Sequence, residues 1–248
     1  MPVKLQQHGH KIGRFRRQVV AISVIAVSLL CLWLMQRSAV KNRCVPQQAG
    51  SDGLMLVGSQ EDVYRACAMR AVRGATIVQL GKFSNLQYWE PEHLGRSTPF
   101  PLRVFDVRPE YEKGLQPHNW LIIASRTGIV RKVVSVLPPE EFRSMTPNLD
   151  ADFGLVRRPG GYFGFHYDVP RTVTVLNMLP AVSESVIVVV DASYFGPGSD
   201  PAETVRMLAE RVPDVALLIA VSSLNEPEVT WEMRRKLALF LRSWQERR

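Results

Sequence analysis

The chain has 248 residues, which is enough for a membrane anchor followed by one domain of ordinary size. Its formal net charge is +8, from 31 Lys and Arg against 23 Asp and Glu. Eight of the basic residues and none of the acidic ones precede Cys44, so the rest of the chain carries 23 of each sign. An electrically even domain lacks the overall positive charge that is typical of proteins binding phosphate backbones, and we expect no nucleic-acid partner.

An uncharged segment, Val19 to Met35, is about the shortest stretch that crosses a hydrocarbon core as a helix. Five basic residues precede it and three follow closely, and this pattern places the N-terminus in the cytoplasm. We therefore predict a single-pass membrane protein in which Val19 to Met35 contacts the lipid bilayer. Its predicted parts are a basic cytoplasmic tail (1–17), a transmembrane helix (18–36), a linker (37–60) and an extracytoplasmic, periplasmic or lumenal, domain (61–248).

Two further observations concern the compartment of the domain. A cleaved signal peptide has a similar charge and apolar pattern, although Gln36 to Ala39 makes a poor cleavage site. Cys44 and Cys67 both follow the apolar segment, and in an oxidising compartment they could form a disulfide between the linker and the first helix. The alternative is that they are two unrelated thiols.

The first half of the domain is predicted to be mixed in structure. A helix begins at Glu61 behind the N-cap residue Ser59 and ends before Gly74. Asn148 to Pro170, which is rich in glycine, is predicted to be a loop. The remaining elements predicted here are strands over 75–80, 102–107, 120–124 and 129–137, the last two joined by a turn, and a short helix over 138–145.

The C-terminal third alternates between strands and helices. The predicted helix 201–211 has Asp200 as its N-cap and Pro201 at its first position. The apolar runs VIVVV and VALLIA indicate strands buried on both faces, as in a parallel sheet covered by helices. The chain is therefore expected to be α/β, a three-layer sandwich with a mostly parallel sheet. The other elements predicted here are strands over 172–177, 185–190 and 215–221 and a closing helix over 228–244.

The most specific motif is SVIVVVDASYFG, in which Asp191 ends a buried strand, the place where α/β folds bind ligands. The alternative role for Asp191 is to cap the turn that follows. A strand that ends in Asp-x-Asp-Tyr-Phe after a Leu-Pro element resembles the arginase/deacetylase-like (ureohydrolase-like) superfamily, and Leu179-Pro180 precedes the strand here. The segment from Ala220 to Leu241 is similar to the closing strand and acidic helix of that family.

The resemblance implies two metal-binding motifs, and both are incomplete. Where the family has Asp-x-His-x-Asp, this chain has Gly81, Phe83 and Asn85. In the second motif Asp191 is kept, and Ser193 replaces the second Asp. One carboxylate with an amide and a hydroxyl is a poor ligand set for a divalent ion. We therefore expect no metal and no other cofactor, and a non-catalytic pseudoenzyme that binds a membrane or envelope partner.

Two enzyme hypotheses stay open beside a purely structural role in a membrane complex. A hydrolase could use Asp191 with His166 and Asp168, which follow a glycine-rich stretch. A type II membrane glycosyltransferase has the same layout of basic tail, anchor and stem, and Asp150 and Asp152 could then hold a divalent ion against a sugar nucleotide.

Other candidate binding residues are Asn85, Ser193 and the aromatic Tyr194. Tyr194 could line a groove for a ligand, and the alternative is that it packs against the sheet. Ser222 follows a predicted strand but does not lie in a Gly-x-Ser-x-Gly motif, so no nucleophile elbow is indicated.

Overall fold

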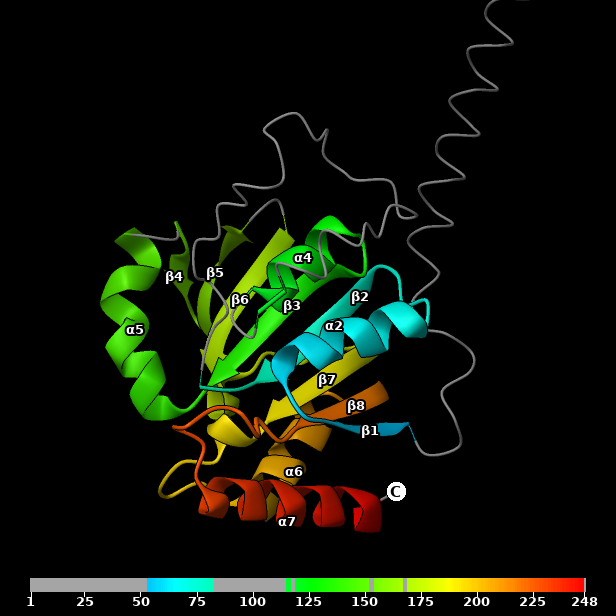
Figure 1. Cartoon of the computed structure of the whole chain (residues 1–248). Helices are drawn as coiled ribbons and strands as arrows, with labels where there is room; N and C mark the ends of the chain where they lie inside the picture. Colours follow the sequence, from blue (N-terminus) through cyan, green and yellow to red (C-terminus); the bar gives the residue numbers. More distant parts are fainter. Residues whose placement is uncertain (1–52, 83–114, 117–118, 152–153, 167–168, 248) are drawn as a thin grey trace, which may run out of the picture. The chain divides into compact units, whose positions relative to one another are not determined.

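The structure, a computed structural model, describes residues 53–82, 115–116, 119–151, 154–166 and 169–247. These residues form an eight-stranded sheet with the order β1-β8-β7-β2-β3-β6-β5-β4 (Figure 1). The strands from β1 to β6 in this order are parallel, and β5 and β4 extend the sheet by antiparallel pairing. The strands are β1 (Leu54–Val57), β2 (Ala75–Leu80), β3 (Val130–Leu137), β4 (Val156–Arg158), β5 (Gly161–His166), β6 (Val169–Val175), β7 (Val186–Asp191) and β8 (Val215–Val221).

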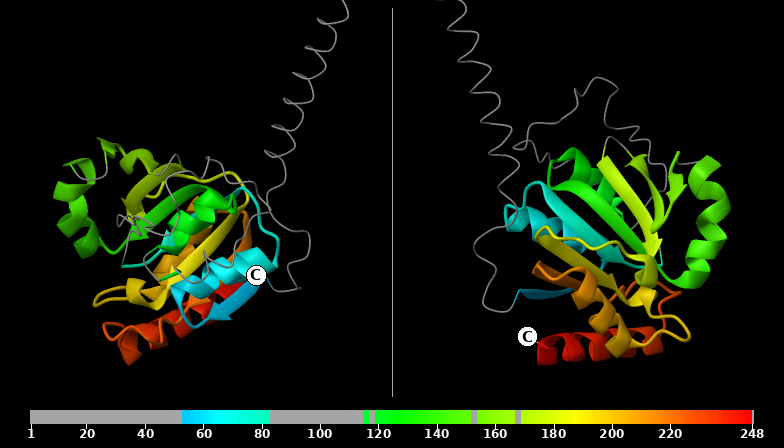
Figure 2. Two further views of the ribbon diagram at one scale, coloured as in Figure 1. Left: turned by 45° about the horizontal axis from the view of Figure 1, so that its top comes forward. Right: turned by 180° about the vertical axis from the view of Figure 1, so that it is seen from behind.

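Helices cover both faces of the sheet, as Figures 1 and 2 show. Successive strand residues face opposite layers: Ile77 packs in the core with α2 and α4, and Val78 packs in the core with α6 and α7. The predicted class, α/β with helices on both sides of a mostly parallel sheet, is confirmed. The helices are α2 (Gln60–Met69), α4 (Trp120–Arg126), α5 (Pro139–Ala151), α6 (Pro201–Arg211) and α7 (Trp231–Arg247).

Local capping explains where two of the helices begin. Ser59 and Asp62 form a reciprocal capping box at the start of α2, in which the Ser59 amide and hydroxyl both donate to Asp62 Oδ2. At α6 the Asp200 carboxylate accepts from the amides of Ala202 and Glu203, and Pro201 occupies the first position. Both helix starts agree with the sequence prediction to within one residue.

The predicted strand over 120–124 is wrong, because Trp120 to Ala124 belong to helix α4. All five side chains are buried, so the run shows no polar face that would reveal a helical period. The helix is closed by Thr127, whose hydroxyl donates to the carbonyl of Ile123, and by Gly128 at a φ of 72°. The following strand, β3, is confirmed, but its neighbours are β2 and β6.

Two segments predicted to lack regular structure contribute strands. Leu54–Val57, which we placed in the linker, forms β1 and pairs with β8. The stretch predicted as a loop over 148–170 contains the end of α5, then β4 and β5, and β6 begins at Val169. β5 could not be recognised from the sequence, because its run GYFGFH contains two glycines and glycine is depleted in strands.

The predicted strand over 102–107 and the predicted transmembrane segment, Val19 to Met35, lie outside the described residues. Within the part of the chain that the structure describes, none of the helices combines the length and the apolar character needed to cross a membrane.

Candidate functional site

The carboxyl-terminal ends of the parallel strands gather polar side chains at one edge of the sheet. β2 and β7 are neighbours, yet the chain continues from β2 towards β3 and from β7 towards β8. The order of the sheet therefore reverses between these strands, which is where open α/β sheets bind their ligands. Lys82 follows β2, Ser193 follows β7 and Ser223 follows β8.

Asp191, the last residue of β7, is completely buried at this edge. Its Oδ2 accepts hydrogen bonds from Gln60 Nε2 at 2.9 Å and from Ser223 Oγ at 2.8 Å. Its Oδ1 accepts from the backbone amide of Ser193 at 2.7 Å, within the short helix η2 (Ala192–Tyr194). Three donors from three segments therefore compensate the burial of this carboxylate, as a buried acidic group requires.

The donors of Asp191 are themselves held in place. Ser223 lies at a φ of 47°, a conformation uncommon for a residue other than glycine. Arg234 on α7 fixes this turn, because its guanidinium donates to the carbonyls of Ser222 and Ser223, each at 3.1 Å. Gln60 is fixed by its position as the first residue of α2. Asp191 consequently joins the ends of β7 and β8 to the start of α2.

Ser193 connects the same edge to β2. Its hydroxyl accepts a hydrogen bond from the backbone amide of Lys82 at 3.1 Å. The Lys82 ammonium lies 2.7 Å from a Glu228 oxygen and 3.8 Å from a Glu141 oxygen. The hydrogen bond to Glu228 is the main reason that the pKa of Lys82 is raised, and the charge of Glu141 adds to it.

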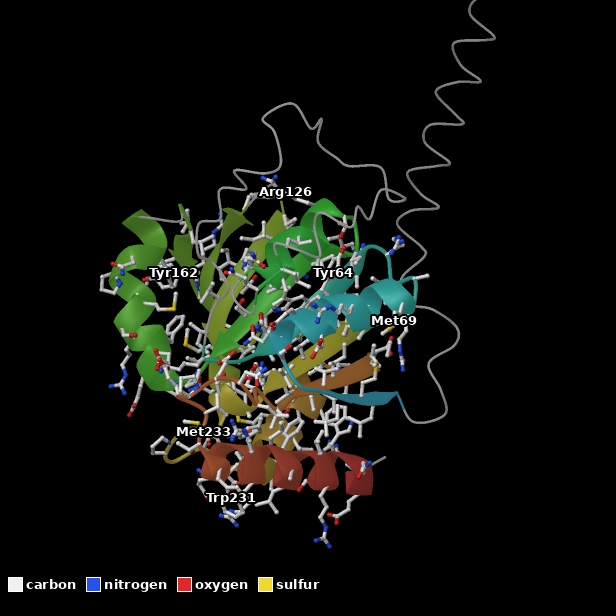
Figure 3. All side chains as sticks on the ribbon, in the orientation of Figure 1. Tyr64, Met69, Arg126, Tyr162, Trp231 and Met233 are labelled. Carbon is white, nitrogen blue, oxygen red and sulfur yellow. The ribbon has the colours of Figure 1, made fainter. Side chains whose placement is uncertain are left out.

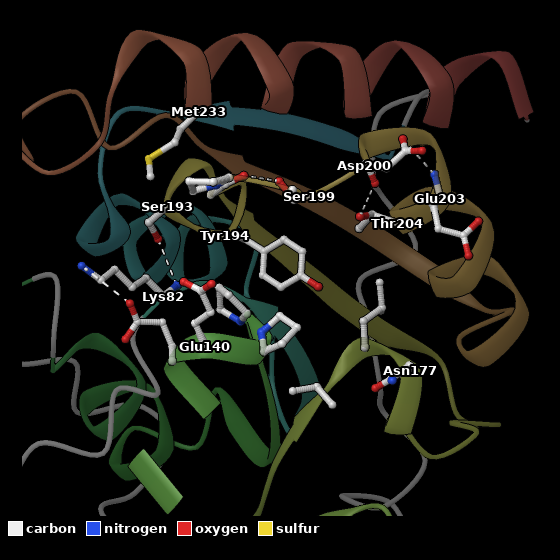
Figure 4. A pocket seen from close by; sticks show the side chains of 18 of the residues that line it. Lys82, Glu140, Asn177, Ser193, Tyr194, Ser199, Asp200, Glu203, Thr204 and Met233 are labelled. Atoms are coloured by element: carbon white, nitrogen blue, oxygen red, sulfur yellow. Dashed lines mark hydrogen bonds and ion pairs between the residues drawn. The ribbon is translucent and has the colours of Figure 1, made fainter. Parts of the chain in front are cut away.

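A pocket of about 530 Å³ opens beside this polar edge, between the start of α5, the end of β6, the turn after β7 and the start of α6 (Figure 4). The ring of Tyr194 lies across it, with Lys82 and Ser193 on one side and Thr204 on the other. Ser193 lines the pocket, whereas Asp191, which accepts a hydrogen bond from the Ser193 amide, does not. Charged lining residues are mainly acidic: Glu140, Glu141, Asp200, Glu203, Glu226 and Glu228, against Lys82 and Arg143.

The pocket carboxyl of Glu226 has a strongly raised pKa. Burial raises its pKa from an ordinary 4.5 to about 7, and the negative charges of Asp191, Glu61 and Glu228 add to the rise. The pocket wall can therefore gain or lose one negative charge near neutral pH.

Of the candidate site residues, Asp191, Ser193 and Tyr194 meet at this edge, and the structure does not bring His166 to them. His166 ends β5 and pairs with Val169 at the beginning of β6, the opposite edge of the sheet. Four strand spacings also separate β5 from β7, which is about 19 Å across the sheet. His166 and Asp191 cannot share an ion whose ligand bonds are about 2–2.5 Å long.

The other candidates are described only in part. Asp150 lies in the last turn of α5. Asp152, Asp168, Asn85 and Cys44 lie outside the described residues. Cys67 forms no disulfide with another described residue and is completely buried, and burial raises the pKa of its thiol to about 12. Its pairing with Cys44 stays a prediction.

Sequence reasoning missed Gln60, Ser223 and Glu226. Ser223 could have been found, because polar residues directly after a buried parallel strand lie at the ligand-binding edge. No local pattern reveals Gln60, whose partner is 131 positions away. Glu226 lies in the segment Ala220 to Leu241, which we interpreted only through its resemblance to a closing strand and helix.

The donor set at Asp191 does not fit the metal centre that the resemblance implies. The carboxylate faces an amide, a hydroxyl and a backbone N–H, all of which donate to it, so a cation would have to displace them. Across the described residues, no three His, Cys, Asp or Glu side chains gather closely enough to hold an ion. No protein-family model matches this sequence, and a search of curated proteins finds none similar to it.

Proposed function

We propose that this chain is a single-pass membrane protein whose extracytoplasmic domain binds a ligand without catalysing a reaction. In this proposal the fold is arginase/deacetylase-like, and the metal ligands of that superfamily have been lost. The bound ligand is a segment of a membrane protein or a component of the envelope, and the pocket beside Tyr194 is its site.

The observation that carries the proposal is the environment of Asp191. A metal-binding carboxylate needs its lone pairs directed at the ion, and those of Asp191 receive three hydrogen bonds from the protein. The residue acts as a structural junction of β7, β8 and α2, which is the capping role extended to three segments. In this proposal the carboxylate of Asp191 stabilises the fold at the end of β7 and does not bind an ion.

The charge of the pocket indicates the chemistry of the ligand. Six carboxylates and two cations line it, and Lys82 is engaged by Glu228 and Glu141. Tyr194 and the side chains of Met207, Val229 and Met233 supply an apolar floor. Such a pocket favours a ligand that presents positive charge on an apolar stem, for example a basic segment of a partner protein.

Metal content tests the metal-free part of the proposal. The full chain is purified in detergent without chelators, and zinc and manganese are measured per chain for wild type and Asp191→Ala. We expect both proteins to contain far less than one ion per chain. Stoichiometric metal in the wild type that disappears in Asp191→Ala overturns the proposal.

Ligand class and topology are tested separately. Calorimetric titration of the full chain with a lysine-rich peptide should show salt-dependent binding that Glu203→Gln weakens severalfold, and a glutamate-rich peptide should not bind. Glu246→Gln is the matched control, because Glu246 is an exposed carboxylate on α7 and does not line the pocket. A C-terminal reporter that is active only outside the cytoplasm should be active, and an inactive reporter contradicts the topology.

A further inference from the structure

Basic residues gather at the edge of the sheet where the strands begin, opposite the pocket. The segments after α2 and α4 lie side by side there, because the amide of Gly74 donates to the carbonyl of Gly128 at 2.8 Å, and Ala75 donates to Ile129 at the same distance. We call the surface that these two segments form with the start of β3 the basic corner. It consists of Met69, Arg70, Arg73, Arg126, Arg131 and Lys132.

The basic corner keeps a positive charge after its internal contacts are taken into account. Glu184 binds both Arg131 at 2.6 Å and Lys132 at 3.0 Å, so one carboxylate serves two cations. Arg73 donates to the carbonyl of Val72 at 2.6 Å. In the described part of the chain, neither Arg70 nor Arg73 forms a salt bridge. The carbonyl end of α2 attracts one arginine, but it does not account for cations on two adjacent segments.

Met69 gives the basic corner an apolar tip. Its side chain is 79 % exposed, the highest value among the large apolar side chains in the described residues. Figure 3 shows Met69 at the end of α2 and Arg126 at the end of α4. An apolar side chain at the same edge as several arginines suits the surface of a bilayer, where the apolar group enters the interface and the guanidinium groups bind lipid phosphates.

The chain enters the domain from this same edge. β1 begins at Leu54 and is parallel to the rest of the central strands, so residue 53 approaches from the side where the strands begin. The predicted anchor ends at Met35, which leaves 17 residues before Gly53. A stretch of 17 residues can reach at most about 60 Å when it is fully extended. The membrane surface is therefore always within reach of the domain, at a high effective concentration.

We infer that the basic corner docks on anionic phospholipid headgroups of the bilayer that anchors the chain. This inference rests on the proposed membrane anchor. Docking fixes the orientation of the domain: the edge with the basic corner faces the lipid, and the edge with the pocket faces away and is open to a partner. The charge and the apolar tip together specify the occupant as a lipid surface.

Hydrogen–deuterium exchange of the full chain in nanodiscs tests the docking. Discs of phosphatidylcholine are compared with discs that contain phosphatidylglycerol as well. We expect amides over residues 65–76 to exchange severalfold more slowly in the anionic discs, and 0.5 M NaCl to remove the difference. The double variant Arg70→Glu/Arg73→Glu should show no difference between the discs, and the milder Arg70→Gln/Arg73→Gln should show a reduced one. Arg157→Glu/Arg158→Glu is the matched control, because these adjacent arginines are exposed on β4, away from the basic corner.

The outcomes separate the docking from the anchor. A chain that stays with the discs but exchanges equally in both lipid mixtures overturns the docking and leaves the anchor intact. A chain that elutes free of the discs overturns the anchor, and the docking with it. Slower exchange that persists in Arg70→Glu/Arg73→Glu assigns the protection to another surface and also overturns the docking.

Discussion

Gln60 Nε2 donates a hydrogen bond of 2.9 Å to Asp191 Oδ2, although the two residues are 131 positions apart in the chain. Gln60 is the first residue of α2 and Asp191 is the last residue of β7, and both are buried. The bond therefore ties the beginning of the domain to the strand at which the order of the sheet reverses.

Replacing Gln60 with Met should destabilise the domain by about 1–3 kcal/mol, because Asp191 Oδ2 loses a donor that buried surroundings cannot replace with water. Thermal unfolding of the full chain in detergent measures the effect. The control is Gln245→Met on α7, where the side chain is exposed and a change close to zero is expected. Equal melting temperatures for the two variants would show that the bond contributes nothing to stability.

Gln79→Met is expected to stabilise the domain, whereas Gln60→Met destabilises it. Gln79 is the penultimate residue of β2, and both polar atoms of its side chain are buried without a hydrogen-bond partner among the residues that the structure describes. Methionine has a similar volume and no unsatisfied amide, so unfolding should require about 1 kcal/mol more. The same melting experiment, run beside Gln60→Met, checks the sign. A loss of stability would mean that the amide makes a hydrogen bond in the native protein.

Gly161→Ala should be severely destabilising. Gly161 has a φ of 133°, and an added Cβ would lie 2.3 Å from the backbone carbonyl oxygen of Val173 on the neighbouring strand β6. The backbone of β5 would have to move, at a cost of about 3 kcal/mol or more. Gly196→Ala is the control, since no atom lies within 4 Å of a Cβ placed there. Soluble yield and melting temperature should fall for Gly161→Ala alone.

Glu226 predicts a particular dependence of stability on pH. Its pKa rises from 4.5 to about 7 on folding, so the folded state binds the proton more tightly than the unfolded state. The resulting stabilisation is complete below about pH 4.5 and is lost as the pH rises towards 7. Glu226→Gln removes this contribution, and its melting temperature relative to wild type should increase between pH 5 and pH 8. A constant difference across this range would contradict the raised pKa of Glu226.

Sequence reasoning located the elements whose signals are local. α6 is marked by Asp200 and Pro201, and β7 and β8 are uninterrupted apolar runs, so their boundaries were predicted to within one residue. Trp120 to Ala124 is equally apolar and yet helical, because complete burial removes the periodicity that distinguishes a helix from a strand. β1 was missed since four residues carry too little pattern.

Only those site residues that end or directly follow a recognisable strand could be predicted from the sequence. The position of Asp191 at the end of β7 could be predicted, and its two possible roles could be named. Its partners Gln60 and Ser223 are contributed by segments that only the folded sheet brings together. The same argument explains His166: a position within a glycine-rich stretch says nothing about which edge of the sheet the residue will occupy.

β1 is the first strand of the domain, and its partner β8 is the last. During synthesis, residues 54–57 therefore have no strand to pair with until the chain has been made through residue 221. The sheet cannot be completed while the ribosome still holds the C-terminal third of the protein. The pairing of β1 with β8 joins the two ends of the sheet-forming sequence, a contact of high sequence separation that forms only late in synthesis.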